Sequence, residues 1–145
     1  MGNSVKLEIM TPSKMFYRGD VDLVIVTTSE GDEGFMFGHS WACKLLEVGE
    51  LWIQEKGAGK DDFRVAAVAG GFIDVQDSII IYTDAVEWSE DIDMDRVLSE
   101  KAKAEDWLTQ HKEDGNTNEV TKAKLAILKA ITRSNVAAGG IRRKR

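Results

Sequence analysis

The sequence predicts a small antiparallel β domain followed by a helical hairpin. Up to about Trp88, apolar residues form short alternating runs that glycine and acidic residues interrupt, a pattern typical of β-strands. From about Asp93 onward, Ala, Leu, Lys and Glu recur at helical spacing. Because no helical stretch separates the strand-like runs, an antiparallel sandwich or barrel is favoured over a parallel sheet. The expected parts are a β domain over 1–88, a helical hairpin over 89–136 and a basic disordered tail over 137–145.

The composition excludes several classes of function. The chain has 145 residues and is 43% hydrophobic, which is enough for one ordered domain with a core. Residues 1–90 carry 7 basic and 16 acidic side chains, whereas residues 91–145 carry 12 and 9. An acidic front half argues against a nucleic-acid partner, because nucleic acids bind to positive surfaces. No run of about 18 apolar residues is present, so we expect no membrane insertion.

The strand predictions cover most of the front half of the chain. The acidic, glycine-rich segment 29–34 is expected to be a loop, and the Gly70-Gly71 pair is expected to separate two strands. The segment 45–53 is expected to give one or two strands, with a break at Gly49. The other expected strands are 6–10, 15–18, 21–27, 63–69, 72–75 and 79–83.

Capping residues predict the limits of the two helices. Asp93 is a good N-cap for the first helix, and Gly115 is a natural stop. Asn116 and Glu119 resemble a capping box at the start of the second helix. The facing positions are mostly small, so the hairpin buries little apolar area and is marginally stable by itself. This marginal stability favours a switch or an adaptor.

The residues offer no catalytic constellation. His39 and His111 are the only histidines and Cys43 is the only cysteine, so no metal-ligand set is complete. The Gly59-Lys60 pair lacks the earlier glycine and the following Ser or Thr of a phosphate-binding loop. We therefore expect no metal, no catalytic residue and no enzymatic activity.

Several segments together resemble the epsilon subunit family of F-type ATP synthases, over about residues 5–135. They are KLEIMTP (6–12), FYRGDV (16–21), SEGDEGFMFGH (29–39), VAGGFIDVQ (68–76) and YTDAVE (82–87), followed by the predicted hairpin. The resemblance implies a β-sandwich of about ten antiparallel strands, followed by an antiparallel two-helix hairpin.

The same resemblance implies a function and a set of partners. It implies a non-catalytic rotor subunit that binds the gamma subunit, rests on the c-subunit ring and meets the alpha and beta subunits when its helices extend. The helices would then restrain ATP hydrolysis. The implied location is peripheral, at the cytoplasmic face of a bacterial cell membrane, with a plastid equivalent less favoured.

The resemblance implies that the acidic segment and the residues that follow it, up to Trp41, contact gamma or the c ring. An ordinary solvated hairpin turn explains the acidic residues as well, and Phe37 and Trp41 stand where the family commonly has proline. Aromatic residues here are either core residues or exposed anchors. The candidate contact residues are Glu30, Asp32, Glu33, His39 and Trp41.

A second implied site lies at the start of the helices. Some bacterial members of the family bind ATP as a regulatory ligand through the pattern Ile/Leu-Asp-x-x-Arg-Ala, from which this chain departs at Val97. A capped helix with basic surface residues explains the same residues equally well, and an independent ATP-sensing module is the alternative function. The candidate ATP-binding residues are Ile92, Asp93, Arg96, Lys103, Lys129 and Arg133.

Overall fold

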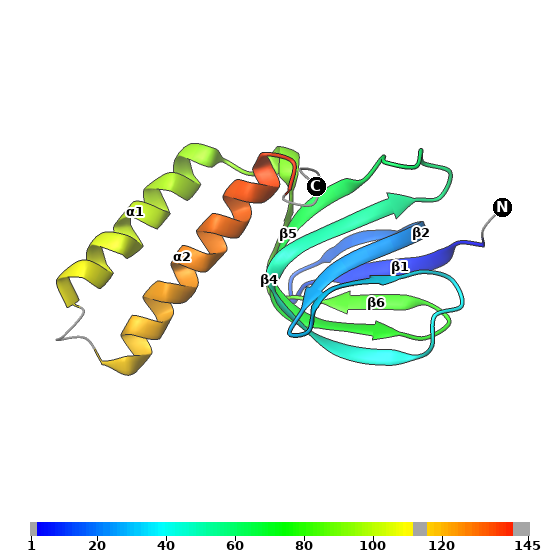
Figure 1. Cartoon of the computed structure of the whole chain (residues 1–145), viewed down its shortest axis with the longest axis horizontal. Helices are drawn as coiled ribbons and strands as arrows, with labels where there is room; N and C mark the ends of the chain where they lie inside the picture. Colours follow the sequence, from blue (N-terminus) through cyan, green and yellow to red (C-terminus); the bar gives the residue numbers. More distant parts are fainter. Residues whose placement is uncertain (1–2, 112–115, 141–145) are drawn as a thin grey trace. The chain divides into compact units, whose positions relative to one another are not determined.

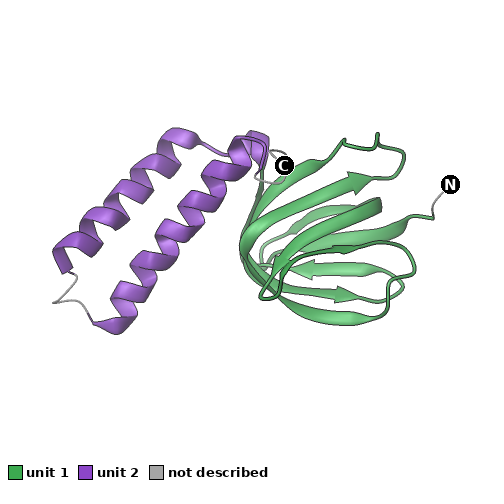
Figure 2. Ribbon diagram, viewed as in Figure 1, with its two compact units in different colours: residues 1–88 green, residues 89–145 purple. Residues whose placement is uncertain are grey.

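The chain folds into two compact units of different structural class. The computed structural model describes residues 3–111 and 116–140. Residues 1–88 form the first unit and residues 89–145 the second (Figure 2). The first unit is built from strands and the second from helices (Figure 1).

The β unit is a closed sheet. Its strands pair in the order β1-β6-β5-β4-β2-β3, and β1 also pairs with β2, so five strands form a ring. The short β3 extends the sheet from β2, and β7 pairs with β5. The strands are β1 (Val5–Met10), β2 (Met15–Thr28), β3 (Gly31–Phe35), β4 (Ala42–Glu55), β5 (Arg64–Val75), β6 (Ile79–Tyr82) and β7 (Val86–Trp88).

The expected count of about ten antiparallel strands is wrong. The described part of the β unit has seven strands, and β1 pairs with β6 in parallel. The difference arises because β2, β4 and β5 are 12 to 14 residues long and continue through positions that the sequence marks as breaks. At the predicted break in β5, Gly70 and Gly71 have φ of +85° and +113°, which turns the strand without ending it. A Cβ at Gly71 would collide with the backbone of Tyr82 and Thr83.

The core fills the inside of the closed sheet. Alternate residues of each strand point inward, which explains why Leu7 and Ile9 on β1 are fully buried together with Ile79 and Ile81 on β6. The remaining fully buried large side chains of this unit include Phe35, Leu51, Ile53, Ile73, Val21, Val24 and Val75. Part of the outward face of the same strands is exposed, as at Leu45 and Phe72.

The second unit is a helical hairpin whose ends follow the predicted caps. It contains η1 (Ser89–Asp91), α1 (Met94–His111) and α2 (Thr117–Ala137). Asp93 caps α1, because its Oδ1 accepts from the backbone N–H of Arg96 at 3.2 Å. Asn116 caps α2, because its Oδ1 accepts from the backbone N–H of Glu119 at 2.8 Å. The stop predicted at Gly115 lies outside the described residues.

The last described residues close α2. The backbone N–H groups of Ala138 and Gly140 donate to carbonyl oxygens of Ser134 and Asn135. The predicted tail thus overlaps the end of a helix at 137–140, and its basic part, 141–145, lies outside the described residues.

Candidate functional site

The acidic segment forms a tight β-hairpin. Strand β2 ends at Thr28, and β3 starts at Gly31, so only Ser29 and Glu30 lie in the turn. The hydroxyl of Thr28 holds this turn, since its oxygen lies 2.9 Å from the carbonyl oxygen of Gly31 and accepts from the backbone N–H of Glu30 at 3.2 Å. The predicted loop is thus partly strand, with Asp32 opposite Thr27 in the ladder.

An ion-pair network inside this hairpin separates the roles of its carboxylates. The Lys44 ammonium donates to Glu33, and the Thr28 hydroxyl donates to the same carboxylate at 2.7 Å. The bond from Lys44, followed by that from Thr28, lowers the pKa of Glu33, and the Glu33 carboxylate in turn raises the pKa of Lys44. Glu33 is therefore engaged within the β unit. The side chain of Glu30 lies 3.8 Å from Lys44 and is 78% exposed.

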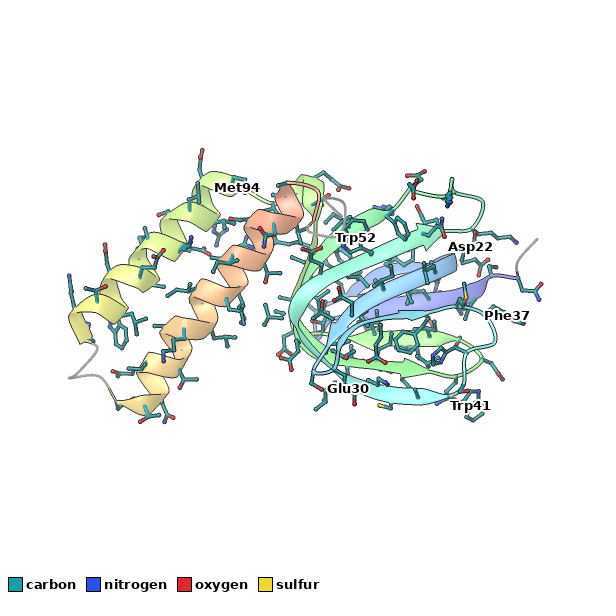
Figure 3. All side chains as sticks on the ribbon, viewed as in Figure 1. Asp22, Glu30, Phe37, Trp41, Trp52 and Met94 are labelled. Atoms are coloured by element: carbon teal, nitrogen blue, oxygen red, sulfur yellow. The ribbon has the colours of Figure 1, made fainter. Side chains whose placement is uncertain are left out.

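The segment between β3 and β4 presents aromatic side chains to solvent. Phe35 is fully buried, whereas Phe37 is 54% and Trp41 is 67% exposed. Both exposed rings lie at the same end of the β unit in Figure 3. The His39 ring packs edge-on against Phe35 at 4.6 Å, and its Nδ1 lies 2.7 Å from the carbonyl oxygen of Ser40. Phe35 therefore belongs to the core, whereas Phe37 and Trp41 do not, and a role of Trp41 as an anchor stays a prediction.

A row of apolar side chains crosses the outside of the sheet. Leu45 pairs with Phe72, Phe72 pairs with Tyr82, and Tyr82 pairs with Met10, which pairs in turn with Met15. Phe72 and Tyr82 stack at 4.8 Å, and Leu45 is 75% exposed. We call Leu45, Phe72, Tyr82, Met10 and Met15 the apolar row. Exposed apolar residues that gather in this way mark an interaction surface.

The apolar row is not visible in the sequence. The sequence pattern predicts strands at its members but does not say which face they occupy, and strand pairing is what brings them together. One signal is available in β4, where the exposed Cys43 and Leu45 alternate with less exposed residues such as Lys44 and Leu46.

The second candidate site brings two arginines together across the hairpin. Arg96 on α1 and Arg133 on α2 donate to the two carboxylate oxygens of Glu100, from Nε at 3.0 Å and from Nη1 at 3.1 Å. Asp93 also belongs to this end of α1, where it caps the helix. Glu100 is not among the site residues that the sequence predicts, although its i,i+4 spacing from Arg96 makes the two side chains neighbours.

The other candidate ATP-binding residues do not take part in the contacts between the two arginines and Glu100. Ile92 is 9% exposed, so it offers little surface to a ligand. Lys103 is exposed and Lys129 is half-buried, and neither forms an ion pair with a described residue. Lys129 lies one turn before Arg133 on α2, where it adds positive charge to the same face.

The described ranges contain neither a group of side chains placed to hold a metal ion nor a helix that could cross a membrane. Among residues 3–111 and 116–140, no group of three or more His, Cys, Asp and Glu side chains is placed to hold a metal ion. Within the same residues, no helix has the length and apolarity needed to cross a membrane.

A closed β unit with an exposed apolar row, followed by a separate two-helix unit, defines a two-domain protein with a surface suited to protein–protein contact. Family models for the ATP synthase delta/epsilon chain match both units. The β-sandwich domain model matches residues 4–89, and the long α-helix domain model matches residues 90–138. The chain belongs to the ATP synthase delta/epsilon chain family.

Similar proteins span nearly the whole chain. The ATP synthase epsilon chain of Caldanaerobacter subterraneus is 34% identical over 140 residues, covering 95% of this chain and 96% of the relative. The epsilon chain of Alkaliphilus metalliredigens is 38% identical over 113 residues, covering 77% and 81%.

The fold also matches solved structures at low sequence identity. A chain in the OSCP/F1/c-ring structure of Euglena gracilis mitochondrial ATP synthase matches with a TM-score of 0.75 at 19% identity, covering 92% of this chain and 82% of that one. A chain in the central stalk/c-ring structure of the Tetrahymena thermophila enzyme matches with a TM-score of 0.62 at 14% identity, covering 93% and 97%. These two likenesses establish the fold.

Proposed function

We propose that this chain is a non-catalytic central-stalk subunit of an F-type ATP synthase. In this role it couples the gamma subunit to the c ring during ATP synthesis driven by an ion gradient, and its helical hairpin restrains ATP hydrolysis. The similarity to epsilon chains supports the role, as do the similar chains in the OSCP/F1/c-ring and central stalk/c-ring structures. The subunit needs no cofactor for this function.

The observation that carries the proposal is the apolar row on the β unit. Leu45 is 75% exposed, and complete burial of a leucine side chain contributes roughly 1.5 to 3 kcal/mol. The Phe72–Tyr82 stack adds two aromatic rings, the residue type that most often anchors protein interfaces. A surface of this kind suits a permanent partner, and we assign the gamma subunit to it.

The acidic hairpin and the neighbouring aromatic segment form the proposed contact with the c ring. Glu30, Asp32 and His39 supply polar groups that complement polar loops, and Trp41 supplies an exposed anchor. Glu33 has a supporting role, because its carboxylate accepts from Lys44 and Thr28 and thereby shapes the hairpin.

These contacts lead to a peripheral location at the cytoplasmic face of a bacterial cell membrane. The subunit is held there by the c ring and inserts no segment of its own into the lipid. The alpha and beta subunits become partners when the helices extend along gamma. Nucleic acids are not expected as partners, because the acidic charge of residues 1–90 repels their phosphates.

The proposed gamma contact is tested by adding a charge to the apolar row. Leu45→Arg should weaken binding of the isolated gamma subunit by at least about tenfold, because the partner would have to bury an unpaired charge. Met36→Arg is the matched control, since Met36 is 54% exposed, lies outside the row and receives the same charge. Calorimetric titration measures both. Equal weakening by the two variants, or an unchanged affinity with Leu45→Arg, would show that the row is not the gamma contact.

A second candidate function is favoured by the two converging arginines. Arg96 and Arg133 reach one carboxylate from different helices, which is an arrangement that also fits a phosphate group. We infer an ATP-sensing role in which the hairpin closes on the nucleotide. Titration of ATP into the full chain by calorimetry tests it, and Arg133→Ala should abolish the heat of binding. A full chain that gives no heat at millimolar ATP would exclude this role.

A further inference from the structure

Glu100 occupies the position between the two arginines. One oxygen of its carboxylate accepts from Arg96 Nε at 3.0 Å, and the other accepts from Arg133 Nη1 at 3.1 Å. The Arg133 side chain is 23% exposed, whereas those of Glu100 and Arg96 are 48% and 72% exposed. The bridge therefore joins a well-covered guanidinium on α2 to an open one on α1.

The chemistry of this bridge resembles that of a bound phosphate. Guanidinium groups bind carboxylate and phosphate oxygens through the same charge-assisted hydrogen bonds. A phosphate that took the same two donors, Arg96 Nε and Arg133 Nη1, would displace both oxygens of Glu100. The internal carboxylate and an external polyphosphate are thus alternatives for one pair of donors.

We propose that Glu100 is a resident anion that competes with polyphosphate for Arg96 and Arg133, and so sets a low affinity for nucleotide. The inference rests on the second candidate function, the binding of ATP to the hairpin. The ligand class is a polyphosphate chain, either free or carried by adenosine. Glu100 also joins α1 to α2 while the ligand is absent.

The local charge supports this competition. Lys129 lies one turn from Arg133, so removal of the Glu100 charge leaves two guanidinium groups and a nearby ammonium group without that carboxylate. A site of this composition attracts a polyanion more strongly than one that contains its own carboxylate. The affinity for polyphosphate should therefore rise when Glu100 is neutralised.

The experiment compares two variants of equal charge. Glu100→Gln keeps the size of the side chain and removes its charge, and Glu105→Gln is the matched control on the same helix. Glu105 lies 4.0 Å from Lys101 and has no such contact with either arginine. MgATP and inorganic tripolyphosphate are titrated separately into each full chain by calorimetry at low salt. The two titrations show whether adenosine contributes to binding.

We expect Glu100→Gln to bind polyphosphate about tenfold more tightly than the unmodified chain, and Glu105→Gln to stay within about twofold of it. Adding Arg133→Ala to Glu100→Gln should remove the gain. An equal gain from both glutamine variants would overturn the inference, because it would reflect net charge alone. So would a gain that survives Arg133→Ala.

The outcomes also separate this inference from the function on which it rests. If the unmodified chain binds ATP and Glu100→Gln binds no more tightly, the competition is refuted while the ATP-sensing role stands. If neither chain binds either ligand, both fail. Hydrogen exchange without ligand gives a further readout, since loss of the bridge should speed amide exchange in α1 and α2 in Glu100→Gln but not in Glu105→Gln. Unchanged exchange in both would refute the bridging role.

Discussion

Alkaline titration of Tyr17 tests the packing of the β unit near its last strand. Tyr17 lies on β2, is 9% exposed and donates from its hydroxyl to Glu55 Oε2 at 2.9 Å. Burial, followed by the hydrogen bond to Glu55, raises the pKa of Tyr17 from 10.0 to about 12. The folded chain therefore holds the phenolic proton more tightly than the unfolded chain does.

This difference in pKa makes the stability depend on pH in a defined window. The contribution of Tyr17 is fully present below pH 10 and is lost as the pH rises from about 10 to about 12. A shift of about two units corresponds to roughly 2 to 3 kcal/mol of unfolding free energy. Tyr17→Phe keeps the ring against Trp88 but loses the hydrogen bond, so it should cost about 1 to 2 kcal/mol near pH 8. The unmodified chain should thus have the larger unfolding free energy near pH 8. This difference from Tyr17→Phe, the gap, should close and then reverse as the pH approaches 12.

Urea unfolding followed by tryptophan fluorescence measures this gap at a series of pH values. Absorbance near 295 nm gives the ionisation directly in a Tyr82→Phe background, because the chain has 2 tyrosines and only Tyr17 then remains. A gap that stays constant between pH 8 and the alkaline limit would refute the reasoning. A Tyr17 midpoint close to 10 would refute it as well.

Three further predictions concern other parts of the molecule. Lys44→Met should raise the pKa of Glu33 toward its ordinary value, as measured by carboxyl NMR titration. The lowered pKa stabilises the fold above about pH 4.5, and this contribution is lost as the pH falls, so it should be smaller in Lys44→Met. An unchanged pKa of Glu33 in this variant would contradict the prediction. Asp93→Ala should destabilise α1 by about 1 kcal/mol through loss of the N-cap, and unaltered amide exchange in α1 would count against it. Deletion of residues 89–145 should leave a folded β unit that still binds gamma while ATP hydrolysis by the complex rises, and unchanged hydrolysis would refute the restraining role.

Much of the fold follows from the sequence because local patterns and local caps decide it. Alternating apolar residues predict most of the strands, and Asp93 and Asn116 predict the starts of both helices, which the structure confirms. The closed ring was not predictable in the same way. It depends on β1 pairing with β6 as well as with its sequence neighbour β2, and the β1–β6 contact joins segments far apart in the sequence. Nor does the sequence show that Gly71 bends a strand instead of ending it.

The candidate sites also differ in whether local sequence or contacts between separate elements define them. The acidic residues and the Asp93–Arg96 pattern are visible as short motifs, so they could be named from sequence. The apolar row requires the register of five strands, and the role of Glu100 requires that α1 and α2 lie side by side. Similarly, the engagement of Glu33 by Lys44 depends on β3 and β4 both lying next to β2.

The end of the β unit is held in place by strand pairing and by contacts with the Trp88 ring. Strand β7 pairs with β5, and its last residue, Trp88, is covered by the Arg64 guanidinium at 3.8 Å from the ring centroid. Phe16 packs on the same indole at 4.8 Å. Residues 86–88 are thus held by the sheet, and the Trp88 ring is held by the side chains of Arg64 and Phe16. A rearrangement of the helices, which the proposed restraint of hydrolysis requires, would have to use the short segment 89–93. The change of pattern that divides the sequence near Trp88 therefore coincides with the last residue that the β unit holds in place.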